Sequence, residues 1–105
     1  MKDYKTSRQF QITEFEDTSG AKCSLQMSSS AIEDKIWLGV NDADPKIMVA
    51  KAKENGLEPQ GENGWMPFPI PDDVLLSTRM HLNREQVAEL LPYLTRFVET
   101  GCIHE

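Results

Sequence analysis

The stretch 74–103 constrains the fold most, because a strand pattern runs directly into a helix that is marked at both ends. Apolar and polar side chains alternate from 74 to 82, as in a strand with one buried face. Asn83 then stands at an N-cap position with Gln86 three residues later, the pattern of a capping box, and Gly101 suits the far end. The helical stripe between them comprises Val87, Leu90, Leu91, Leu94, Phe97 and Val98. We predict a strand over 74–82 and an amphipathic helix after Asn83.

Three earlier stretches also predict strands. The first begins at Arg8 and includes Phe10 and Ile12, and the second covers 22–28 beyond a turn that ends at Gly20. These two form a predicted hairpin with one polar face. Residues 36–40 are apolar on both faces, which is typical of a central strand.

The remaining segments predict a second helix and an irregular loop. Asp44 and Pro45 resemble an N-cap followed by the first helical residue, and the segment ends at Asn55-Gly56. Prolines and glycines interrupt 58–71, and residues 1–8 are polar, so we expect a loop and a frayed end there. The sum is an α+β fold: a small antiparallel sheet of about four strands with two helices packed on one face, a two-layer sandwich, in a single domain over 1–105.

Charge and composition limit the function. The chain has 11 basic and 17 acidic residues, a net charge of −6, which argues against direct nucleic-acid binding. It has neither an apolar run long enough to cross a membrane nor the apolar segment of a signal peptide, so we expect a cytoplasmic protein without a membrane partner. Cys23 is expected to be buried and Cys102 exposed, without a disulfide between them.

No motif for catalysis, a metal or a cofactor is found, so we predict a non-enzymatic protein with no catalytic residues, no metal site and no cofactor. Asp42 and Asp44 resemble the start of a calcium loop, but Lys46 and Ile47 occupy the next ligand and glycine positions. A hydrolase remains an alternative. It would pair His81 as a base with Ser24, Ser28 or Cys23 as the nucleophile.

One basic cluster stands out on the acidic chain. Arg79 and His81 share the polar face of the predicted strand 74–82, and Arg84 lies in the first turn of the helix that follows. With the positive end of the helix, these three residues are candidates for binding a nucleotide-like anion. The alternative is that they only balance nearby surface acids.

Three aromatic residues are candidates for binding a partner: Trp37, Trp65 and Phe68. Trp37 lies in the predicted central strand, where a tryptophan is also compatible with the core. Trp65 and Phe68 lie in the proline-rich loop, which either covers the core or displays these rings for recognition.

Several segments together resemble a group of small phage and prophage proteins of unassigned function. They are Cys23-Ser24-Leu25-Gln26 with Ser28-Ser29, Ile36-Trp37-Leu38-Gly39, and Arg79-Met80-His81-Leu82. The resemblance covers most of the chain and supplies no catalytic motif. It implies a bacterial or phage cytoplasm and an accessory role, directed against a host defence or regulatory system. We therefore predict an acidic protein that acts by protein–protein interaction and forms a homodimer, with anion sequestration as the alternative.

Overall fold

The computed structural model of the chain describes residues 1–5 and 11–104, and its contacts divide it into two compact units. Unit 1 comprises Met1–Asn41 and Thr78–Glu105, and unit 2 comprises Asp42–Ser77. The prediction of a single domain over 1–105 stays a prediction.

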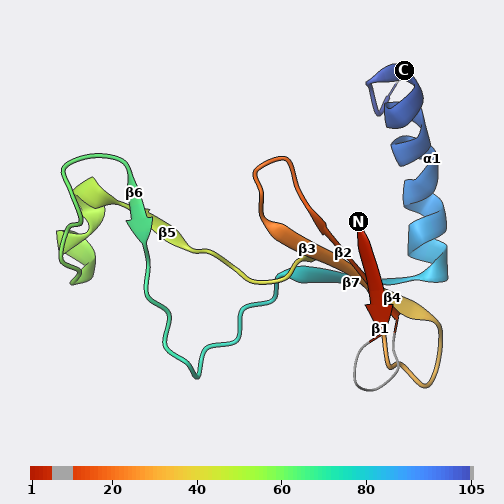
Figure 1. Cartoon of the computed structure of the whole chain (residues 1–105), viewed down its shortest axis with the longest axis horizontal. Helices are drawn as coiled ribbons and strands as arrows, with labels where there is room; N and C mark the ends of the chain where they lie inside the picture. Colours follow the sequence, from red (N-terminus) through yellow and green to blue (C-terminus); the bar gives the residue numbers. More distant parts are fainter. Residues whose placement is uncertain (6–10, 105) are drawn as a thin grey trace. The chain divides into compact units, whose positions relative to one another are not determined.

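Unit 1 is built on a five-stranded antiparallel sheet in the order β1-β2-β3-β4-β7 (Figure 1). The strands are β1 Lys2–Lys5, β2 Gln11–Glu16, β3 Lys22–Met27, β4 Lys35–Val40 and β7 Arg79–Asn83. The first four follow one another as a meander, and β7 joins β4 after the chain returns from unit 2. The predicted hairpin is β2–β3, with Gly20 at a φ of 85° in its turn. Arg8 and Phe10, where that hairpin was predicted to begin, lie outside the described residues.

The strand β1 was not predicted, because its residues are polar. It pairs with β2 in register, and side chains join the two strands on both faces of the sheet. Thr13 donates a hydrogen bond to Asp3 at 2.6 Å, and the Tyr4 phenol donates to the Glu14 carboxylate. Charged residues are common on edge strands, where they discourage pairing with other chains.

The register assigns every side chain of the sheet to one of two faces. One face is apolar across β2, β3, β4 and β7 and carries Phe15, Cys23, Leu25, Met27, Ile36, Leu38, Val40, Met80 and Leu82. The other face, which we call the polar face, carries Ser24, Gln26, Trp37, Arg79 and His81 at its centre. As predicted, Cys23 is buried and Cys102 is exposed.

The helix α1, Arg84–Thr100, follows β7 with no connecting loop. Its N-terminus carries the predicted capping box: the Gln86 backbone N–H donates to Asn83 Oδ1 at 2.8 Å, and the Asn83 N–H donates to Gln86 Oε1 at 3.0 Å. Gly101 ends the helix at a φ of 81°. Of the described residues, none belongs to a helix that is long and apolar enough to cross a membrane.

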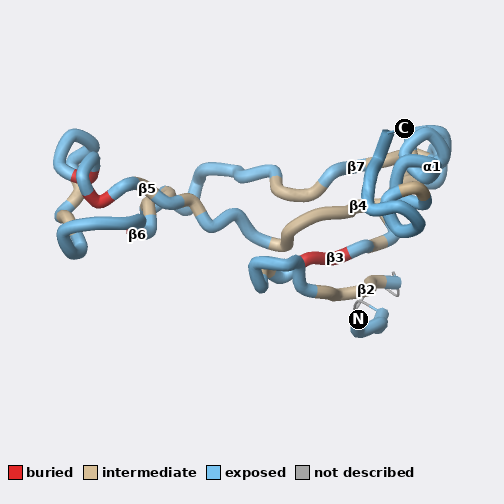
Figure 2. The backbone as a smooth tube through the Cα atoms, turned by 90° about the horizontal axis from the view of Figure 1, so that it is seen from above, coloured by how far each residue is buried: buried red, intermediate tan, exposed pale blue. Residues whose placement is uncertain are grey.

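Unit 2 is a two-stranded ribbon with two short 3-10 turns. Its elements are β5 Lys46–Met48, η1 Val49–Lys51, η2 Lys53–Asn55 and β6 Trp65–Pro67. Val49, Ala52 and Met66 form its small core, with Ile47 and Leu57 packed against them. Figure 2 shows the buried residues of this core in red.

The predicted fold class is therefore wrong. Within the described chain there is one α-helix and a sheet of five antiparallel strands, with a further two-stranded sheet, rather than two helices on four strands. The segment predicted as a helix after Pro45 instead forms β5, η1 and η2, because its backbone pairs with the distant strand β6. The predicted strand over 74–82 is also shorter, since β7 begins only at Arg79.

Candidate functional site

The polar face of the sheet holds a grid of side chains around Trp37. In one row Ser24 lies opposite Gly39, and Gly39 lies opposite Arg79. In the next row Gln26 lies opposite Trp37, and Trp37 lies opposite His81. Gly39 contributes no side chain, so the first row is open at its centre and the Arg79 side chain can extend across β4.

Arg79 uses that opening to reach β3. Its Nη1 donates hydrogen bonds to Gln26 Oε1 at 2.7 Å and to Ser24 Oγ at 3.3 Å, and Ser24 is only 1% exposed. The guanidinium carbon lies 5.5 Å from the centre of the Trp37 ring, within the range of a cation–π interaction. Both hydrogen-bond partners are neutral. Within residues 1–5 and 11–104, no carboxylate lies at ion-pair distance from Arg79.

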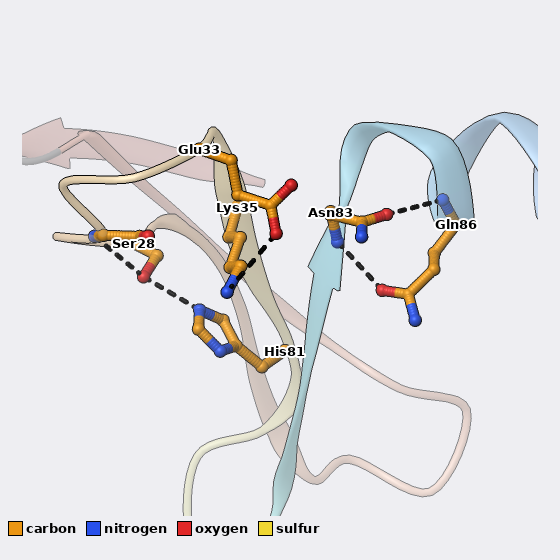
Figure 3. A network of polar contacts seen from close by, with 7 residues as sticks. Ser28, Glu33, Lys35, His81, Asn83 and Gln86 are labelled. Atoms are coloured by element: carbon orange, nitrogen blue, oxygen red, sulfur yellow. Dashed lines mark hydrogen bonds and ion pairs between the residues drawn. The ribbon is translucent and has the colours of Figure 1, made fainter.

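His81 covers the other part of Trp37. The two rings stack with their centroids 3.9 Å apart and their planes 9° apart. His81 Nε2 and Ser28 Oγ also share a hydrogen bond of 2.8 Å, and the Ser30 backbone N–H donates a longer bond of 3.4 Å to the same hydroxyl oxygen (Figure 3). The imidazole is thus held between an aromatic ring and a hydroxyl.

The Ser28–His81 pair has the contact that the hydrolase alternative requires, a hydroxyl in hydrogen-bond reach of an imidazole. Such pairs work when a third group orients the base. Over the described part of the chain, no carboxylate makes a hydrogen bond with His81. The other two candidate nucleophiles are engaged elsewhere: Ser24 accepts a bond from Arg79, and the Cys23 thiol donates to the Ala21 carbonyl at 3.5 Å.

Arg84 does not join the other two residues of the predicted anion cluster. Its guanidinium lies 3.8 Å from the Asp34 carboxylate in an exposed pair. It lines a groove with Ile36 and Leu82, which belong to the apolar face of the sheet, whereas Arg79 and His81 lie on the polar face. The candidate anion site therefore consists of Arg79 and His81 with Trp37.

A second candidate site lies on the ribbon of unit 2. Met48 pairs with Trp65 and Lys46 with Pro67, so these four residues share the outward side of the ribbon, which we call the Trp65 face. Trp65 is 67% exposed, whereas its neighbour Met66 points inward and is buried. Two backbone hydrogen bonds hold the ribbon together on either side of Trp65. The Val49 N–H donates to the Gly64 carbonyl, and the Phe68 N–H donates to the Pro45 carbonyl.

The three predicted partner-binding aromatics have different surroundings. Trp37 belongs to unit 1 and is half-buried between His81 and Arg79. Trp65 and Phe68 both belong to unit 2, where Trp65 is open to solvent and Phe68 is half-buried. The loop 58–71 therefore both contributes Met66 to a core and displays Trp65.

Three residues were not predicted in the roles that the structure gives them. Gln26 and Ser24 were not predicted as hydrogen-bond partners of Arg79, and Met48 was not predicted as part of the Trp65 face. The alternation of 22–28 placed Ser24 and Gln26 on a polar face, but only the register with β4 brings them to Arg79.

In the described ranges no group of three or more His, Cys, Asp or Glu side chains is arranged to hold a metal ion. Comparison with protein-family models, curated proteins and solved structures finds no match for this chain.

Proposed function

We propose that the chain is a non-enzymatic accessory protein that acts by binding another protein through the Trp65 face. The observation that carries this proposal is the exposure of Trp65 on a ribbon whose opposite side is packed. Tryptophan is among the residues that contribute most to protein interfaces, and an exposed one on an ordered strand binds at a small cost in conformational entropy. Met48 and Pro67 extend the apolar area around it.

Charge indicates the chemistry of the partner. Unit 2 contains seven acidic and three basic side chains, a net charge of −4, which is most of the net charge of the chain. An apolar pocket that accepts an indole and is surrounded by basic groups would complement this unit. The phage or prophage type, the cytoplasmic location and a target in a host defence or regulatory system rest on the resemblance described above, and we propose them on that basis.

A paired substitution tests the role of Trp65. The immobilised chain is exposed to a bacterial lysate, the captured proteins are purified, and their dissociation constants are measured by calorimetry. Trp65→Ala should weaken binding of the physiological partner by about 30-fold or more, the size typical of an interface hot spot. Leu75→Ala is the control, because Leu75 is another exposed apolar residue of unit 2 that lies outside the Trp65 face. Equal binding of all captured proteins to the chain and to Trp65→Ala would overturn the proposal.

A second candidate function is binding of a nucleotide-like anion on the polar face, and the observation that favours it is the Arg79 guanidinium with only neutral hydrogen-bond partners. An anion with a planar group would pair with Arg79 and lie against the exposed part of the Trp37–His81 stack. Thermal unfolding in AMP or inorganic phosphate, against sodium chloride of equal ionic strength, tests this. Stabilisation that disappears in Arg79→Met and persists in Arg84→Met would support it, and no stabilisation by either probe would dismiss it.

A further inference from the structure

Among the described residues of unit 1, none covers the apolar face of its sheet. Leu25 and Met27 of β3 and Met80 of β7 are all exposed, with Met80 at 53%. Only Cys23 on this face is buried. A sheet with a continuous apolar face normally packs against a helix or a second sheet, because burial of that face supplies most of the stability of the fold.

The apolar stripe of the helix α1 is likewise not packed against a sheet within the described residues. None of its residues is buried, and Figure 2 shows it exposed along almost its whole length. Phe97 is 56% and Val98 85% exposed, and only Val87 in the first turn is half-buried among the stripe residues. A helix of 17 residues is marginal in water unless such a face is packed.

The two apolar surfaces are continuous. A groove of about 570 Å³ lies where α1 leaves β7, and its lining includes Met27, Ile36 and Leu82 from the sheet with Val87 and Leu91 from the helix. Because Asn83 is both the last residue of β7 and the helix N-cap, no loop allows α1 to turn back over its own sheet. The capping box further fixes this junction.

We propose that a second copy of the chain covers these surfaces, with α1 of each copy lying across the apolar face of the other copy's sheet. Each copy then supplies the element that the other lacks, and one two-fold axis satisfies both contacts. The sizes agree. The stripe from Val87 to Val98 extends over about 17 Å of α1, and the four strands that carry the apolar face span about 14 Å from the first to the last.

The charged residues of α1 do not oppose this contact between two copies, although the chain is acidic. Four charged residues of α1 lie on the side opposite the stripe at 100° per residue: Glu85, Glu89, Arg96 and Glu99. The fifth, Arg84, already lies beside Asp34. Two copies can therefore meet through the stripe without bringing like charges together. With nine apolar side chains on the sheet and six on the helix, each copy also has an apolar core for an interface of standard size, about 20–30 residues a side.

Sedimentation velocity over a range of concentrations tests the proposal on the full chain. The chain should sediment as a dimer. Leu94→Asp in the stripe and Met80→Asp on the sheet should each raise the dimer dissociation constant by about 30-fold or more. Glu89→Asp places the same residue on the far side of α1 and should leave the dimer unchanged. Because α1 is marginal in water without a packed face, both variants should show a reduced helical signal in circular dichroism, and the mixed pair should recover it.

Mixing the two disruptive variants identifies the arrangement. Leu94→Asp retains an intact sheet face, and Met80→Asp retains an intact helix stripe. In the mixed pair, the helix of the Met80→Asp copy can therefore pack on the sheet of the Leu94→Asp copy. A heterodimer should form at concentrations where neither variant dimerises alone. A dimer of two helices alone would instead survive Met80→Asp. A monomeric chain, or a dimer unaffected by Met80→Asp, would overturn the proposal, and neither result bears on binding through the Trp65 face.

Discussion

Trp37 lies flat against His81, its direct partner across the β4–β7 ladder, with 3.9 Å between the ring centroids. This stack and the Arg79 guanidinium on the same indole join three strands on the polar face, since Arg79 is also hydrogen-bonded to β3. Few residues of the sheet are buried within one copy, so these contacts on the polar face are among those that hold its strands together.

Replacing Trp37 should therefore destabilise the sheet. Trp37→Leu removes the stack and the cation–π contact, and we expect a loss of about 1–3 kcal/mol in the free energy of unfolding. Urea unfolding followed by circular dichroism measures it, at one protein concentration for every variant. Trp65→Leu, a change of the same type at an exposed site of unit 2, should stay within about 0.5 kcal/mol. Equal effects of the two substitutions would contradict the role given to the stack.

Gly39 is required by two features at once. Its φ is 151°, and a Cβ built on it would lie 2.8 Å from the Thr78 carbonyl oxygen and 3.0 Å from Arg79 Cα. Gly39→Ala should therefore cost about 2 kcal/mol or more in unfolding free energy. Gly61→Ala is the control, because Gly61 also has a positive φ, 102°, but nothing lies within 4 Å of its Cβ position. A smaller loss in Gly39→Ala than in Gly61→Ala would show that the close approach is unimportant.

The junction at Asn83 was predictable because a capping box is local in sequence. Asn83→Ala removes the acceptor for the Gln86 N–H and should lower the unfolding free energy by about 1 kcal/mol and reduce the helical signal of α1. Asn63→Ala, in the exposed loop before β6, serves as the control. Both changes are measured by thermal unfolding at 222 nm, and indistinguishable curves for the two variants would argue against the cap.

Local patterns failed where pairing with a distant segment decided the outcome. Asp44-Pro45 satisfies the rules for a helix start, yet Lys46–Met48 pairs with Trp65–Pro67, about twenty residues away, and no local signal encodes that pairing. The alternation at 74–78 continues past the point where β4 ends at Val40. These residues therefore have no neighbouring strand and stay exposed, apart from the half-buried Thr78.

In the candidate sites, too, local sequence patterns predicted some features, and the pairing of distant strands determined the others. Alternation within one strand placed Arg79 and His81 on a common face, which the structure shows. Their partners Trp37, Gln26 and Ser24 depend on the registers of β3 and β4, and register is a property of the paired strands rather than of either strand alone. Exposure of Trp65 likewise depends on which side of the ribbon is packed, which is set by the core around Met66.

The edge strand β1 should respond to alkaline pH through Tyr4. Its phenol donates to the Glu14 carboxylate, and that hydrogen bond, with smaller effects of desolvation and the Glu14 charge, raises the pKa of Tyr4 above its ordinary value of 10.0. A raised pKa in the folded state means that the contribution of Tyr4 to stability is complete below pH about 10 and is lost as the pH rises through the folded pKa.

Tyr4→Phe isolates this contribution. The difference in unfolding midpoint between the chain and Tyr4→Phe should be constant from neutral pH to about pH 9 and should shrink above about pH 10, where ionised Tyr4 faces ionised Glu14. The difference in their absorbance at 295 nm reports the ionisation of Tyr4 directly and should show a midpoint above the ordinary value. A midpoint at or below that value, or a stability difference that grows with alkaline pH, would contradict the hydrogen bond between β1 and β2.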